Sequence, residues 1–331
     1  MFVTKPAYFD QFSCIAGDCP DSCCKEWQVL VDPESAQRYR SLPGPLGDRL
    51  RQVLTEEEGR TDMTGEEGRC PMWRQDGLCR IQAQLGEAAL CQVCREFPRL
   101  RHDYGDFVEL GLELSCPVAA RLILEDRNLP PVTFREAEAG EAEYDREAME
   151  VLLSSRQKML QILSDGSRPV GECLTLGVLY GYQVQGVLDG GEETDFSPET
   201  ALESARDLAK APREDALPEF FLGLEILTED WKNRLNAPQP GPWQEQHRAL
   251  ARYFVQRYWL QAVSDYDLYS RVKLMAVSCI LIRHLGGDLT RTAQLYGKEI
   301  ENNPDNIDAI LDAAYASPAM TDDILLGWLL K

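Results

Sequence analysis

The second half of the chain carries a regular pattern of apolar and polar positions. Apolar side chains recur at three- and four-residue spacing, which is typical of helices with one buried face. The segments with this pattern are 144–163, 201–210, 219–235, 244–263 and 266–285. Three pairs of a capping residue and a proline indicate further helix starts, because proline fits the first helical position. These pairs are Ser197-Pro198, Asn303-Pro304 and Ser317-Pro318.

The first third of the chain has shorter elements. Asp32 followed by Pro33 predicts a helix start, since the carboxylate can cap free backbone N–H groups. Two extended runs around Gly105 predict a β-hairpin over 99–115. The other expected elements are a strand at 27–31, a loop at 55–69, a helix at 118–124 and a linker at 128–140.

Cysteine usage divides the chain in the same way. Nine of its 11 cysteines lie in the first 116 residues, namely Cys14, Cys19, Cys23, Cys24, Cys70, Cys79, Cys91, Cys94 and Cys116. Cys173 and Cys279 lie in apolar helical stretches, and we expect both to be core residues. The predicted fold is mainly α: a cysteine-rich, metal-binding N-terminal region (1–127) with a small β-hairpin, followed by an α-helical domain (141–331).

Charge and targeting signals narrow the partners and the location. The chain has 331 residues and a formal net charge of −21, which disfavours nucleic acid because phosphate needs a basic surface. Its acidity instead favours basic partners at long range, or simply confers solubility. The sequence shows no secretory signal and no apolar stretch of about 18 residues, so we expect a cytoplasmic protein without a membrane partner.

Clustered cysteines in a reducing compartment indicate metal binding more than disulfides. Iron–sulfur clusters are held by cysteine thiolates, commonly a close-spaced run with a remote member. Zinc is the alternative metal, but only Cys91 and Cys94 form a CxxC pair and the chain has only three histidines. Nine thiols exceed what one cluster takes, so either two metal sites exist or some thiols are structural or face a substrate.

The order of motifs around these cysteines resembles the flagellin lysine-N-methylase (FliB-like) family and, more broadly, the YkgJ-type cysteine-cluster proteins. The resemblance covers roughly the first 120 residues. Its motifs are FSCIA at 12–16, Cys19, Cys23-Cys24, Trp27, CPM at 70–72, DGLC at 76–79, LC at 90–91, CREFPR at 94–99 and the stretch 109–117.

The resemblance implies a cytoplasmic methyltransferase that modifies the ε-amino group of lysines on flagellin. S-adenosylmethionine would be the methyl donor, and a [4Fe-4S] cluster would be required. The sequence has no glycine-rich dinucleotide fingerprint after a strand, so a Rossmann methyltransferase is unsupported. The radical-type spacing Cys-x3-Cys-x2-Cys is also absent, because Cys24 follows directly after Cys23.

Methylation of lysine needs a neutral amine, whereas free lysine has a pKa of about 10.4. The site must therefore desolvate the ammonium or supply a base. Tyr104, Glu109 and Glu113 on the expected hairpin are catalytic candidates, with ordinary solvation or hairpin packing as the alternative.

Three other residues are candidates for cofactor binding. Arg95 and Arg99 follow Cys94 closely, and a guanidinium could pair with a cluster or hold the donor's carboxylate. A surface salt bridge is the alternative for both. Trp27 could stack on an adenine or cover a cluster, although core packing would also explain it.

Two other functions fit the cysteine pattern. A YkgJ-like protein could hold or transfer iron or zinc without catalysis, although storage does not require so large a helical companion. A thiol redox protein is a weaker alternative, because the single CxxC motif lies among seven other cysteines. The sequence leaves the oligomeric state open.

Overall fold

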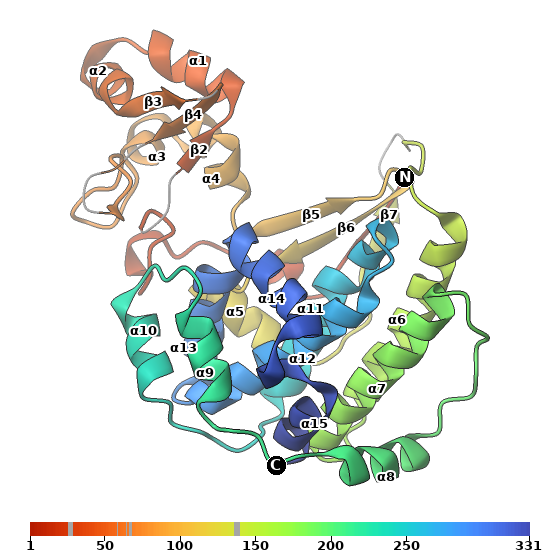
Figure 1. The fold of residues 1–331 in the computed structure, drawn as a ribbon. Helices are drawn as coiled ribbons and strands as arrows, with labels where there is room; N and C mark the ends of the chain where they lie inside the picture. Colours follow the sequence, from red (N-terminus) through yellow and green to blue (C-terminus); the bar gives the residue numbers. More distant parts are fainter. Residues whose placement is uncertain (26–28, 58, 64, 66–67, 136–139) are drawn as a thin grey trace.

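The computed structural model describes the chain except for residues 26–28, 58, 64, 66–67 and 136–139. Helices dominate it, as predicted, and two small sheets lie within residues 2–135 (Figure 1). Among the helices that can be described, none combines the length and apolar character needed to cross a membrane.

A small module projects from the main helical body (Figure 1). Its strands form an antiparallel sheet in the order β2-β4-β3. Its elements are β2 (Val29–Val31), α1 (Pro33–Ser41), α2 (Gly44–Val53), β3 (Leu54–Glu57), β4 (Arg60–Met63), α3 (Arg80–Leu85) and α4 (Gln92–Glu96). The module has its own buried cluster, which includes Leu50, Met72 and Ile81.

The β3–β4 hairpin corrects the loop predicted at 55–69. Three of the four residues of β3 are exposed, so this strand has no alternation of apolar and polar positions. Backbone pairing of Leu54 with Met63 and of Glu57 with Arg60 forms the ladder instead. The predicted strand at 27–31 is confirmed over Val29–Val31, and its first two positions lie outside the described residues.

Asp32 caps two helices of the module at once. One carboxylate oxygen accepts a hydrogen bond from the Ser35 amide at 2.9 Å, as predicted for the start of α1. The other accepts from the Gln92 amide at 2.8 Å, at the start of α4. Desolvation would raise the pKa of Asp32, but these hydrogen bonds hold it below the usual value. The shared cap places Cys91, which precedes α4, beside the end of β2.

The second sheet confirms the hairpin predicted at 99–115. It has the order β5-β6-β1-β7 and comprises β1 (Phe2–Lys5), β5 (Arg99–Asp103), β6 (Phe107–Leu112) and β7 (Val132–Arg135). β7 corrects the linker predicted at 128–140, because it pairs antiparallel with β1. All four residues of β7 are exposed, so this edge strand has no buried apolar face by which the sequence could predict it.

The main body consists of packed helices. They are α5 (Pro117–Leu124), α6 (Arg146–Leu163), α7 (Val170–Leu188), α8 (Pro198–Leu208), α9 (Ala216–Leu222), α10 (Glu229–Asn236), α11 (Gln246–Tyr258), α12 (Leu268–Leu285), α13 (Leu289–Tyr296), α14 (Pro304–Ala316) and α15 (Asp322–Leu330). The predicted helix at 219–235 is two helices, because Thr228 caps a new helix through a hydrogen bond from the Trp231 amide. The segment predicted at 244–263 ends in a 3-10 turn over Trp259–Ser264.

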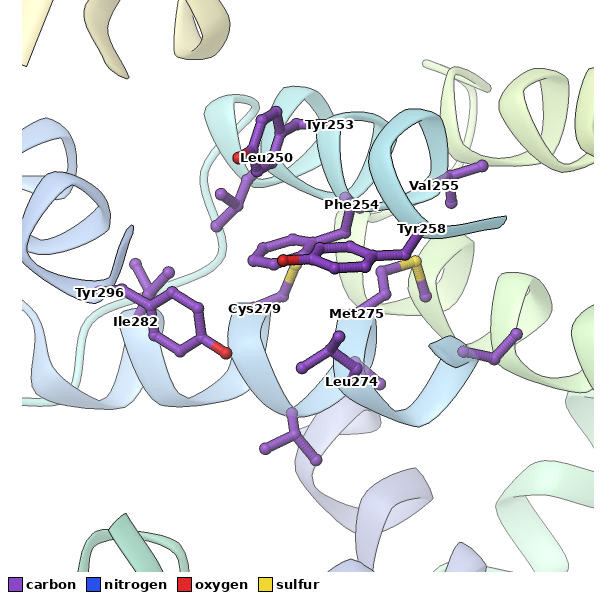
Figure 2. Packing of buried hydrophobic residues seen from close by; sticks show 14 of the residues in the cluster. Leu250, Tyr253, Phe254, Val255, Tyr258, Leu274, Met275, Cys279, Ile282 and Tyr296 are labelled. Carbon is purple, nitrogen blue, oxygen red and sulfur yellow. The ribbon is translucent and has the colours of Figure 1, made fainter. Parts of the chain in front are cut away.

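Helix α12 lies at the centre of the large core. Figure 2 shows its Met275 and Cys279 beneath the rings of Phe254 and Tyr258 on α11. Cys279 and Cys173 are 0% and 1% exposed, so both are core residues as predicted. Helix α13 continues into a π-helical turn, η6 (Gly297–Glu301), in which all five residues are buried. Such turns frequently mark functional sites.

Candidate functional site

All nine N-terminal cysteines line one cavity of about 380 Å³, here called the thiol cavity. They arrive from separate segments, namely the loop 14–24 (the thiol loop), the module and the start of α5. Cys70, Cys91 and Cys116 are buried, Cys14 and Cys23 are exposed, and the other four are intermediate. The fold therefore brings together thiols that are up to about a hundred residues apart in the sequence.

Six of these thiols belong to the module and the end of the thiol loop. The Cys70 amide donates to the Cys24 carbonyl at 2.8 Å, which aligns these two segments. Trp73 and Cys79 form a short antiparallel bridge. Cys91 precedes α4 and Cys94 lies on its first turn. This group, the module thiols, consists of Cys23, Cys24, Cys70, Cys79, Cys91 and Cys94.

Hydrogen bonds connect the module thiols. Cys24 donates to Cys23, which raises the pKa of Cys24 to about 12, and it accepts from Cys70. The pKa of Cys70 is raised as well, mainly because its thiol donates to Cys24 and secondly because it is buried. Cys91 accepts from Cys94, which lowers the pKa of Cys91 to about 7 and raises that of Cys94. Within this pair, Cys91 is therefore the thiol that ionises more easily.

The remaining three thiols, Cys14, Cys19 and Cys116, lie near one another, and Cys116 belongs to the core of the helical body. Burial raises the pKa of Cys116, and the neighbouring Cys19 and Cys14 raise it further. Burial likewise raises the pKa of Cys19, whose thiol donates to the Asp21 carbonyl at 2.7 Å. We call this group the body thiols.

Within the part of the chain that the structure describes, no group of three or more Cys, His, Asp or Glu side chains could hold one ion. A cluster makes a different demand, because its thiolates bind different iron atoms and need not meet at one point. The set of donors, all of them sulfur, is the kind that iron–sulfur clusters use.

A buried ion pair forms the wall between the thiol loop and the helical body. Lys298 donates to both oxygens of Asp21, at 3.1 and 3.3 Å, and both residues line the thiol cavity. Gln294 and Arg291 of α13 donate to the same carboxylate at 2.9 and 3.2 Å. Desolvation would raise the pKa of Asp21, but Lys298, Gln294 and Arg291 hold it below the usual value.

The predicted cofactor-binding residues have different surroundings. Arg95 and Arg99 both line the thiol cavity and are exposed. The guanidinium of Arg99 lies 5.0 Å from the centre of the Phe12 ring, in a cation–π contact. Trp27 lies outside the described residues.

None of the three predicted catalytic residues, all of them described, lines the thiol cavity. Tyr104 stacks on Phe107 with ring centres 4.7 Å apart and lines a separate polar cavity. Glu109 forms a bidentate ion pair with Arg156, with N–O distances of 2.6 and 2.8 Å. Glu113 accepts from the Ser115 hydroxyl at 3.1 Å, and burial raises its pKa.

The sequence did not single out Asp21, Gln294 and Lys298, whose mutual contacts we call the Asp21 clamp. Asp21 stands between Cys19 and Cys23, and this position was its only signal. Gln294 and Lys298 lie more than 170 residues after Cys116, in a segment without cysteine or motif. Only the fold brings them to the thiols.

Comparisons with known proteins identify relatives of part of the chain. The flagellar biosynthetic protein FliU of Salmonella muenchen is 34% identical over 131 residues, which cover 38% of this chain and 78% of that protein. The lysine-N-methylases of Salmonella typhimurium and Salmonella choleraesuis are also 34% identical over 131 residues. The match spans only 33% of the length of these two enzymes.

No protein-family model and no solved structure matches the chain. The identity to FliU extends over most of that protein's length, and the lysine-N-methylases match with the same identity. The chain therefore belongs to the flagellin lysine-N-methylase (FliB-like) family.

Proposed function

We propose that this protein methylates the ε-amino groups of lysines on flagellin, with S-adenosylmethionine as donor and a [4Fe-4S] cluster in the thiol cavity. The observation that carries the proposal is the meeting of nine cysteines in one cavity of a chain from this family. The relatives named lysine-N-methylase support the reaction, and the name of FliU supports a flagellar substrate.

Cys24, Cys70, Cys91 and Cys94 are the ligands we propose for the cluster. They form two hydrogen-bonded pairs in which Cys94 senses the charges of Cys24 and Cys70. Four thiolates are the usual ligand set of a cubane, which would supply redox or Lewis-acid chemistry when bound. The thiols give up their protons on loading, and Cys91 gives up its proton most easily because it accepts from Cys94.

The reaction is an in-line displacement. The lysine nitrogen attacks the methyl carbon, the carbon–sulfur bond breaks, and S-adenosylhomocysteine leaves with the electron pair. The nitrogen then loses a proton. In this proposal Arg95 and Arg99 hold the donor's carboxylate, because both guanidinium groups border the cavity.

The amine must be neutral before it attacks. Burial in the cavity and the neighbouring guanidinium groups of Arg95 and Arg99 both disfavour an ammonium there. Tyr104, Glu109 and Glu113 remain candidates for the base only if the substrate reaches their side of the hairpin. Desolvation is therefore the main cause by which the pKa of the substrate lysine would be lowered.

Anaerobic reconstitution with iron and sulfide tests the metal. Broad visible absorption with roughly four iron and four sulfide per chain supports the cluster, whereas a colourless protein with stoichiometric zinc contradicts it. Incubation with unmodified flagellin and S-adenosylmethionine, followed by mass spectrometry, tests the reaction. An unchanged flagellin mass with loaded protein would contradict the proposed activity.

A further inference from the structure

Asp21 attaches the thiol loop to one segment of the helical body. Its carboxylate accepts hydrogen bonds from Arg291 and Gln294 of α13 and from Lys298 of the π-helical turn. The side chain of Asp21 is 10% exposed and that of Lys298 is 2% exposed. Because Asp21 follows Cys19 by two residues, these contacts fix where that thiol lies.

Gln294 extends this attachment to Cys116. Its side-chain amide donates to Asp21 at 2.9 Å and also to the Ser115 carbonyl at 2.8 Å. Gln294 is 1% exposed, so both bonds form away from water, where a lost partner is costly. One amide group thus ties the loop of Cys19 to the residue that precedes Cys116.

A buried ion pair is an inefficient way to gain stability, because desolvation of two charges offsets most of their attraction. Such pairs can instead fix one arrangement among several. Here the Gln294 amide joins two segments that are far apart in sequence and that both carry thiols of one cavity, and the ion pair anchors the first of them to the helical body. These contacts therefore fix the relative positions of the thiols.

We propose that Asp21, Gln294 and Lys298 are positioning residues that hold the thiol loop, with its body thiols and the proposed ligand Cys24, in place and couple docking of this loop to metal loading. This inference rests on the proposed iron–sulfur function. A cluster that binds only the docked arrangement stabilises docking by mass action. By the same linkage, contacts that hold the loop in place slow the loss of the cluster.

The test compares Asp21→Asn with Asp126→Asn in the full chain. Asp126 is a matched control, since its side chain is 14% exposed and pairs with Arg252 at 3.4 Å, away from the thiol cavity. Each reconstituted protein is mixed with an iron chelator, and iron release is followed by absorbance. We expect release at least tenfold faster in Asp21→Asn and within twofold of wild type in Asp126→Asn.

Two further variants separate positioning from stability. Asp21→Glu keeps the carboxylate and should recover part of the slow release. Asp21→Asn combined with Lys298→Met removes both charges of the ion pair, and this double variant should still release iron at least tenfold faster than wild type. Release within twofold of wild type in either Asp21→Asn protein, or equal acceleration in Asp126→Asn, would overturn the inference.

A metal-free measurement keeps this inference apart from the proposed function. If wild-type protein takes up no iron and sulfide, the cluster proposal fails, but the clamp still predicts thiol accessibility. In metal-free Asp21→Asn, alkylation of Cys19 and Cys116 should be at least fivefold faster than in wild type, with Cys91 unchanged. Unchanged rates at Cys19 and Cys116 would refute the clamp itself.

Discussion

Gly297 is the point where the π-helical turn touches the segment that carries Cys116. A Cβ atom at this position would lie 2.6 Å from the Ser115 nitrogen, 2.7 Å from the Leu114 Cβ and 2.9 Å from the Leu114 carbonyl carbon. All three distances are too short for real contacts, and two involve backbone atoms, which cannot rotate away. Gly297→Ala must therefore push the turn and the Ser115 segment apart.

Overpacking of this kind costs about 1–3 kcal/mol in the free energy of unfolding. Gly186→Ala is a matched control, because Gly186 is also a helical glycine but a Cβ there would meet nothing within 4 Å. Alanine loses less backbone entropy than glycine on folding, so this variant should be more stable by about 0.4–1 kcal/mol. Glycine-to-alanine substitution should thus lower the free energy of unfolding at Gly297 and raise it at Gly186.

Urea unfolding at neutral pH, followed by circular dichroism, measures both free energies. Iron release from the reconstituted proteins shows whether the shift reaches the thiol cavity, and only Gly297→Ala should accelerate it. A Gly297→Ala protein as stable as wild type, with Gly186→Ala stabilised as expected, would refute the contact on which this reasoning depends.

Three other predictions concern the cysteines, the Glu109–Arg156 ion pair and His247. Cys94→Ala should lose bound iron whereas Cys173→Ala, in α7, should retain it, and equal retention by metal analysis would contradict the division of the cysteines. Glu109→Gln should lower the free energy of unfolding by about 1–3 kcal/mol, because it leaves Arg156 without its carboxylate, and an unaltered urea midpoint would rule this out. Burial lowers the pKa of His247 to about 4, below its value in the unfolded chain. Neutral His247 therefore contributes about 3 kcal/mol to the free energy of unfolding above pH 6.5, and this contribution is lost as the pH falls toward 4. Urea unfolding of wild type and His247→Asn between pH 7 and 4.5 checks this, and identical pH slopes would disprove it.

The sequence predicted those parts of the fold that depend on local signals. Asp32 and Ser197 accept amide hydrogen bonds at the helix starts they were expected to cap. The hairpin around Gly105 also formed as predicted, because glycine with a positive φ permits its turn. The break between α9 and α10 was missed, since apolar spacing continued across the non-helical residues 223–228, which end at the capping residue Thr228.

The strands that were missed share a different cause. β3 and β7 are mostly or wholly exposed, so neither shows the alternation by which a half-buried strand is predicted. Both are held by backbone pairing with neighbours that the local sequence does not indicate. The π-helical turn is likewise set by a long-range contact, the approach of Gly297 to Ser115.

The division of the cysteines was beyond prediction because it follows from two cores rather than from spacing. Cys70 and Cys91 belong to the buried cluster of the module, whereas Cys116 belongs to that of the helical body. The thiol cavity therefore lies where the two cores meet, and any shift of one core against the other changes the distances between its sulfur atoms. Cys24, one of the four proposed ligands, lies at the end of the thiol loop, and the Asp21 clamp joins this loop to α13, so the clamp couples the position of a ligand to the helical body.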